Sequence, residues 1–155
     1  MGEYEVAQIC TQGHILTTIE RYGAGSDFCC KCGSRTLTEC EKCSAKIRGY
    51  YNVPGFIGST DIDLPQFCHN CGEGYPWYEE VVRAALEAFA EAFPESLIDE
   101  RQEFDRNVRD MLKACPRQEV AASKVAKAIK GVSNDAFKAI LWNLCTIPVQ
   151  RALGW

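Results

Sequence analysis

The chain has 155 residues, of which 46% are hydrophobic and 25% are charged, and its formal net charge is -4 at pH 7. This composition is typical of globular proteins and excludes a disordered chain. The negative charge, which thiolates on bound metal would increase, argues against bulk electrostatic capture of nucleic acid, because such capture depends on Lys and Arg at the phosphates.

The N-terminal stretch MGEYEVAQIC is acidic and has no apolar run, so it does not resemble a secretory signal. The most apolar stretch, AILWNLCTIPV, is interrupted by Asn143 and Pro148 and is far shorter than the roughly 20 residues of a membrane span. We therefore expect a cytoplasmic protein without a membrane segment, in which the ten cysteines stay reduced.

Four short turns in the first half of the chain carry pairs of metal-ligating residues, and we call each turn a knuckle. The pairs are Cys10 and His14, Cys29 and Cys32, Cys40 and Cys43, and Cys68 and Cys71. The short spacing lets both side chains of a pair point to one centre, and Gly33 and Gly72 follow two of the pairs, where such turns favour a left-handed residue. Eight ligands fill two tetrahedral sites, which predicts two bound Zn²⁺ ions.

Taken in chain order, the knuckles form one site from the first two pairs and a second site from the last two. β-prone residues around Gly, Asn or Pro turns separate the two knuckles of each site, as a hairpin within one zinc ribbon would. A cross-braced grouping, which joins the first knuckle to the third and the second to the fourth, stays open. The four thiolates of the second site also suit a single redox iron ion.

The metals are expected to be structural, because protein ligands fill all four positions and leave none for water or substrate. Two small ribbons gain only ~3–5 kcal/mol from apolar packing, whereas structural zinc supplies ~10–16 kcal/mol per site. No phosphate-binding glycine loop or catalytic set is present, and we expect no enzymatic activity. Cys30 is surplus to the ligands and lies beside Lys31, which makes redox sensing an alternative function.

The stretches YEVAQIC, FCCKCGSRT, TECEKCSAKIRGYYNVPG and FCHNCGEGYPW resemble an uncharacterised family of small bacterial proteins with a double zinc ribbon at the N-terminus. The resemblance covers residues 4–78 and implies a bacterial origin and zinc binding by the eight knuckle residues. It transfers no biochemical role to this chain, and Cys30 has no assigned place in the family pattern.

Aromatic and apolar residues cluster in the long hairpin of the second ribbon, at Tyr50, Tyr51, Phe56 and Ile57. On a rigid ribbon such residues anchor a protein interface or stack on bases. We take this hairpin as the candidate surface for a protein partner, with internal packing as the competing role. Trp77 and Tyr78, after the last knuckle, are better candidates for packing.

Helical periodicity begins after residue 76. Apolar residues recur at helical spacing within 82–93, 104–115 and 121–132, and Ser133 is a good N-cap for a fourth helix that Pro148 would end or kink. The predicted fold is small and α+β, with zinc-ribbon hairpins over 1–36 and 37–76 followed by an all-α bundle of about four helices over 77–155. A homo-oligomer formed through the helical half stays open.

Lys124, Lys127 and Lys130 form a basic stripe beside a segment with the spacing of a helix-turn-helix, which makes a nucleic-acid-binding regulator the alternative function. Against it, the would-be recognition helix has no Arg and few donors for base edges. The function predicted from sequence is therefore a zinc-binding, non-enzymatic adaptor or regulatory protein that presents its aromatic hairpin to a protein partner.

Overall fold

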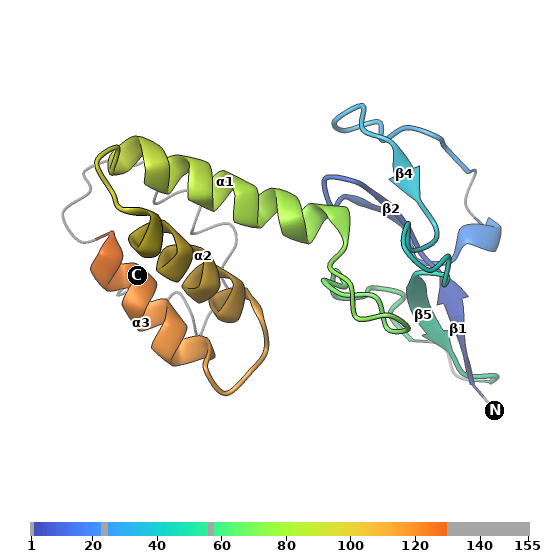
Figure 1. The fold of residues 1–155 in the computed structure, drawn as a ribbon. Coiled ribbons are helices and arrows are strands. Elements are labelled where there is room, and N and C mark those ends of the chain that lie inside the picture. Colours follow the sequence, from blue (N-terminus) through green and yellow to red (C-terminus); the bar gives the residue numbers. More distant parts are fainter. Residues whose placement is uncertain (1, 23–24, 56–57, 130–155) are drawn as a thin grey trace. The chain divides into compact units, whose positions relative to one another are not determined.

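The computed structural model describes residues 2–22, 25–55 and 58–129 (Figure 1). The chain divides into two compact units, residues 1–80 and 81–155. Short antiparallel strands precede three helices in the described residues, which confirms the predicted α+β class. The predicted fourth helix, from Ser133 onward, lies outside the described residues.

The described residues of the first unit contain five short strands, which lie in two antiparallel sheets. They are β1 (Glu3–Val6), β2 (Gln8–Cys10), β3 (Ile15–Thr17), β4 (Thr36–Leu37) and β5 (Arg48–Asn52), with a short 3-10 helix, η1 (Glu20–Tyr22), after β3. β2 lies between β3 and β4 in one sheet, and β1 pairs with β5 in the other (Figure 1). β1 belongs to the predicted first ribbon, residues 1–36, and β5 to the predicted second ribbon, residues 37–76. The two predicted ribbons therefore share a sheet.

Gly49 lets β5 approach the neighbouring backbone closely. The Ala7 N–H donates to the Ile47 carbonyl at 2.9 Å, and the Tyr50 N–H donates to the Thr18 carbonyl at 3.0 Å. A Cβ atom on Gly49 would lie 2.1 Å from the Thr18 carbonyl oxygen and 3.0 Å from the Ala7 nitrogen. Both obstacles are backbone atoms, so only glycine fits at this position.

A small core lies between the strands and the knuckles. Its buried residues come from the strands, from two knuckles and from the start of the first helix: Ala7, Ile9, Leu37, Cys40, Ile47, Cys68, Tyr75 and Trp77. The Trp77 ring stacks on Tyr75 with 4.7 Å between centroids, and its indole N–H donates to the Pro65 carbonyl at 2.7 Å. Tyr78 is also buried and packs against Phe67. Both residues that the sequence favoured for packing are therefore interior.

Three helices follow, α1 (Pro76–Ala92), α2 (Ile98–Leu112) and α3 (Gln118–Ala128). The apolar stripes predicted from periodicity are buried at their central positions, among them Val82, Phe89, Phe104, Val108 and Val125. Phe89 of α1 stacks on Phe104 of α2 with 4.0 Å between ring centroids, and α2 packs along α3 (Figure 1). None of the described helices is long and apolar enough to cross a membrane.

We predict that Gly49→Ala lowers the free energy of unfolding of the first unit by about 1–3 kcal/mol, because the added methyl must displace backbone rather than a flexible side chain. The measurement is the urea midpoint of Trp77 fluorescence in zinc-loaded protein whose other tryptophans, Trp142 and Trp155, are replaced by Phe. Gly25→Ala is the matched control, since a Cβ atom there meets nothing within 4 Å. Equal midpoints for the two variants would contradict the close approach at Gly49.

Candidate metal centres

The first metal centre joins the first two knuckles. The donor atoms of Cys10, His14, Cys29 and Cys32 all lie within 4.8 Å of one another. The Cys10 Sγ is 3.5 Å from the His14 Nδ1 and 3.8 Å from the Cys32 Sγ, and the Cys29 Sγ is 3.7 Å from the same Nδ1. Zn–S bonds of ~2.3 Å and Zn–N bonds of ~2.0–2.1 Å give tetrahedral edges of about 3.8 Å between sulfurs and about 3.6 Å between sulfur and nitrogen. The donor spacing therefore fits a tetrahedral ion.

The second centre joins the last two knuckles through Cys40, Cys43, Cys68 and Cys71, whose Sγ atoms also lie within 4.8 Å of one another. The Cys40 and Cys71 Sγ atoms are 3.8 Å apart, and those of Cys43 and Cys68 are 3.6 Å apart. These distances again match a tetrahedral edge. Both clusters follow the tandem grouping, whereas the cross-braced grouping would have placed Cys10 and His14 with Cys40 and Cys43.

The three Cys-x2-Cys knuckles share one backbone turn. The carbonyl of the first cysteine accepts a hydrogen bond of 2.8–2.9 Å from the N–H of the residue after the second, and these donors are Gly33, Ser44 and Gly72. Each donor residue has a positive φ, of 71°, 56° and 73° respectively. The two glycines could be recognised in the sequence as left-handed positions. Ser44 adopts the same left-handed conformation although it is not a glycine, at a cost of ~1–3 kcal/mol.

The first knuckle is connected directly to the core. Gly13 has a φ of 84°, and its N–H donates to the Cys10 carbonyl at 2.8 Å. A Cβ atom on Gly13 would lie 3.1 Å from a Leu64 methyl carbon and 3.2 Å from the Trp77 Cβ. Glycine is needed there both for the turn and for the close contact with Trp77.

Hydrogen bonds to sulfur stabilise thiolates in both centres. The His14 N–H lies 3.3 Å from the Cys10 Sγ, the Asn70 N–H 3.4 Å from the Cys68 Sγ, and the Asn70 side-chain amide 3.5 Å from the Cys43 Sγ. Such donors hold the ligand sulfurs in place and favour their charged form.

The thiol pKa values differ within each centre. Hydrogen bonds from the Ser34 hydroxyl and N–H lower the pKa of Cys32 to about 6. Burial opposes ionisation of Cys68, yet the N–H groups of Cys71 and Asn70 lower its pKa to about 6. Although the N–H of Glu73 favours the Cys71 thiolate, burial and the neighbouring thiols raise the pKa of Cys71 to about 12. In each centre at least one ligand thiol therefore ionises more readily than an ordinary cysteine, which favours metal binding.

The donor sets specify closed centres. Each centre has two buried cysteines, one half-buried ligand and one exposed cysteine, Cys32 or Cys71. Four protein donors are as many as a tetrahedral ion takes. Cys30 is exposed and stands outside both clusters.

Of the candidate partner-binding residues, Tyr50 and Tyr51 lie on β5, and Phe56 and Ile57 lie outside the described residues. Tyr51 is exposed and Tyr50 is half-buried. Sequence reasoning missed Tyr4, which lies opposite Tyr51 on β1 with 4.8 Å between the ring centroids. The alternation in EYEV was the available signal, but a strand of four residues is too short for it to stand out.

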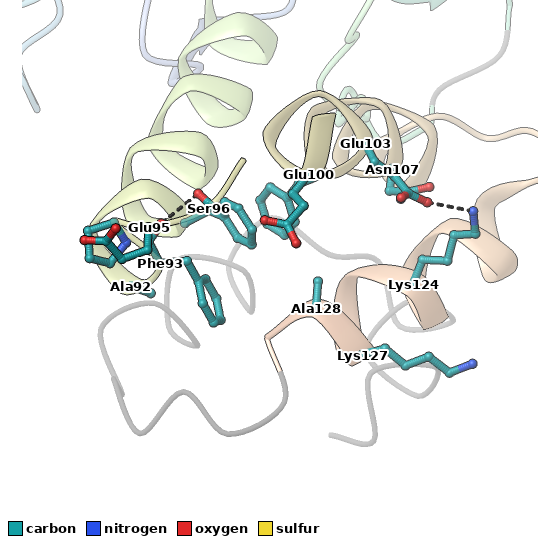
Figure 2. Close-up of a pocket in the computed structure, with 13 residues that line it drawn as sticks. Ala92, Phe93, Glu95, Ser96, Glu100, Glu103, Asn107, Lys124, Lys127 and Ala128 are labelled. Carbon is teal, nitrogen blue, oxygen red and sulfur yellow. Dashed lines mark hydrogen bonds and ion pairs between the residues drawn. The ribbon is translucent and has the colours of Figure 1, made fainter. Parts of the chain in front are cut away.

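The basic stripe is only partly described, because Lys130 lies outside the described residues. Lys124 and Lys127 lie on α3 beside an apolar groove of about 640 Å³, whose lining includes Phe89, Phe93 and Ala128 (Figure 2). The Lys124 Nζ is 3.1 Å from a Glu103 carboxylate oxygen, so the Lys124 charge is compensated within the helical unit (Figure 2).

Cys68→Ser should reduce the metal content from two ions to one, because three thiolates no longer close the second tetrahedron. Native mass spectrometry beside a denatured spectrum measures the stoichiometry. The matched control is Cys30→Ser, which removes an exposed thiol outside both clusters and should leave two ions bound. Loss of an ion from the Cys30 variant would contradict the assignment of ligands.

Metal affinity should fall more steeply below about pH 6 than above it. A thiol whose pKa is lowered by folding stabilises the folded state, and this stabilisation is complete above the ordinary thiol pKa of 9.0. The stabilisation is lost as the pH falls through about 6, where Cys32 and Cys68 take up protons. Below that pH, one more proton competes with the metal in each centre, so the logarithm of the affinity should lose about one further unit per pH unit. Zinc titration against a competing chelator between pH 5 and pH 8 measures this slope, and a constant slope through pH 6 would contradict the prediction.

The whole chain can be compared with known proteins. Residues 3–152 match the model of a family described as "Uncharacterized protein conserved in bacteria" (DUF2321). No curated protein and no solved structure matches the chain. The family match covers both metal clusters and all three described helices, so it extends the resemblance seen in residues 4–78 into the helical half. The chain belongs to this bacterial family, DUF2321.

Proposed function

We propose that this protein is a non-enzymatic adaptor or regulatory protein, in which two structural Zn²⁺ ions stabilise the first unit and its exposed tyrosines bind a protein partner. The observation that carries the proposal is the combination of two fully liganded centres with a pair of exposed aromatic rings on the sheet beside them. Three thiolates with an imidazole are a usual zinc ligand set, and four thiolates suit zinc as well as iron.

The two exposed rings form what we call the aromatic face, which consists of Tyr4 and Tyr51, while the neighbouring Tyr50 on β5 is half-buried. Tyr4 is 52% exposed and Tyr51 is 47% exposed, although their rings contact each other. Single exposed apolar residues are common, but adjacent tyrosines on paired strands present a continuous, rigid surface. Tyrosines of this kind dominate the binding energy of many protein interfaces, because they lose little side-chain entropy on binding.

The charge of the first unit supports a protein partner over nucleic acid. Residues 1–80 contain six Lys and Arg and eleven Asp and Glu, a net charge of -5. Two zinc ions bound by seven thiolates and one histidine would make it about -8. Four of the six basic side chains are paired with carboxylates: Arg21 with Glu5, Arg35 with Glu41, Lys42 with Glu73, and Lys46 with Glu39. Few basic groups remain to neutralise phosphates.

The proposal predicts that Tyr51→Ala weakens capture of the partner more than tenfold, because it removes a central aromatic contact. The test isolates tagged protein from its own cells at moderate salt, then quantifies the co-purifying protein and the metal content by mass spectrometry. Tyr22→Ala is the matched control, since Tyr22 is 77% exposed and lies outside the aromatic face. Both variants should retain two zinc ions.

Three results would contradict the proposal. Equal capture by the Tyr51 and Tyr22 variants would remove the aromatic face as the binding surface. Co-purified nucleic acid whose binding falls steeply between low and moderate salt would favour the nucleic-acid alternative. Iron in place of zinc, detected by visible absorption, would favour redox function at the second centre.

A further inference from the structure

The aromatic face borders a shallow hollow of about 510 Å³ in the first unit. Its lining combines Tyr4 and the β5 residues Arg48, Tyr50 and Tyr51 with a second segment that contributes Ser59, Asp61, Ile62 and Asp63. The hollow therefore combines aromatic rings with carboxylates, a set of groups that recognises cations.

The two carboxylates are not neutralised by the described chain. Asp61 and Asp63 are both exposed, and Asp61 accepts a hydrogen bond of 2.8 Å from the Ser59 hydroxyl. Within the described residues neither forms an ion pair with Lys or Arg, in contrast to Glu39, Glu41 and Glu73 around the knuckles. The hollow thus has two carboxylates without an ion pair beside its rings, and their charge exceeds that of Arg48 by one.

The aromatic face already accommodates one cation from its own chain. The Arg48 guanidinium carbon lies 4.6 Å from the centroid of the Tyr4 ring. This is the geometry of a cation–π contact, so a guanidinium fits against this surface. One positive charge in the hollow faces two carboxylates, and the first unit as a whole carries a net charge of -5.

We propose that this hollow binds a Lys or Arg side chain from an extended segment of a partner protein. The inference rests on the proposed function and adds the chemistry of the partner. The incoming cation packs against the exposed Tyr51 ring and forms charge-assisted hydrogen bonds with Asp61 or Asp63. The surrounding negative field raises the association rate of a basic segment and disfavours an acidic one.

The test selects peptides from a random phage-displayed library on the full-length, zinc-loaded protein and measures the affinity of the selected peptides. These peptides should carry Arg or Lys, and replacing that Arg by uncharged citrulline should weaken binding. The double variant Asp61→Asn with Asp63→Asn should bind roughly threefold to tenfold more weakly. The double variant Glu20→Gln with Asp27→Asn is the matched control, because it removes two exposed charges outside the hollow and should change the affinity less than twofold.

Arg48→Gln tests the sign of the interaction. This substitution uncovers the Tyr4 ring and removes a positive charge that would repel an incoming cation. A basic peptide should therefore bind about twofold to fivefold more tightly. Weaker binding to the Arg48 variant would show that an acidic segment occupies the hollow, and the inference would fail.

The failure of this inference can be told from the failure of the proposed function. In one outcome, the peptides bind more weakly to the Tyr51→Ala variant but equally well to the Asp61 and Asp63 double variant. This result would retain the aromatic face as the partner surface and overturn its preference for a basic side chain. Peptides that are unaffected by Tyr51→Ala, or the absence of any selected peptide, would overturn both.

Discussion

The first unit depends on one constraint: in each of its two centres, four donor side chains converge on one point. Its strands have between two and five residues, and its core contains few large side chains, among them Ile9, Ile47 and Trp77. Such a core stabilises a fold by only ~3–5 kcal/mol, whereas each structural zinc supplies ~10–16 kcal/mol. In the proposed function, metal ligation therefore sets the positions of the strands, and the strands in turn set the surface.

The aromatic face follows from this arrangement. Its strand β5 begins soon after the third knuckle, and the hydrogen bond from Ala7 to Ile47 fixes β1 beside it. The close approach at Gly49 then holds β5 against the backbone of Thr18. Tyrosines on strands fixed in this way lose little conformational freedom on binding, so more of their contact energy appears as affinity. A structural metal can therefore support binding without touching the partner.

Local features of this chain were predictable from its sequence, and non-local ones were not. The ligands were readable because a knuckle is a short turn of fixed spacing, and the helices because apolar periodicity is continuous over many residues. The left-handed conformation of Ser44 could not be predicted, because serine rarely adopts that conformation and does not indicate it in a sequence. The pairing of Tyr4 with Tyr51 brings together two strands far apart in the sequence. Nor could spacing show that Asp61 and Asp63 lie beside that pair.

The most direct test of the account is removal of both metal ions by a strong chelator, followed by amide NMR spectra of the full-length protein. The account predicts that dispersed signals from residues 2–22, 25–55 and 58–80 collapse while those of α2 and α3 persist, because both metal centres lie in the first unit. Two equivalents of zinc should restore the lost signals. Unchanged dispersion in the first unit after metal removal would contradict the claim that metal ligation holds this unit together.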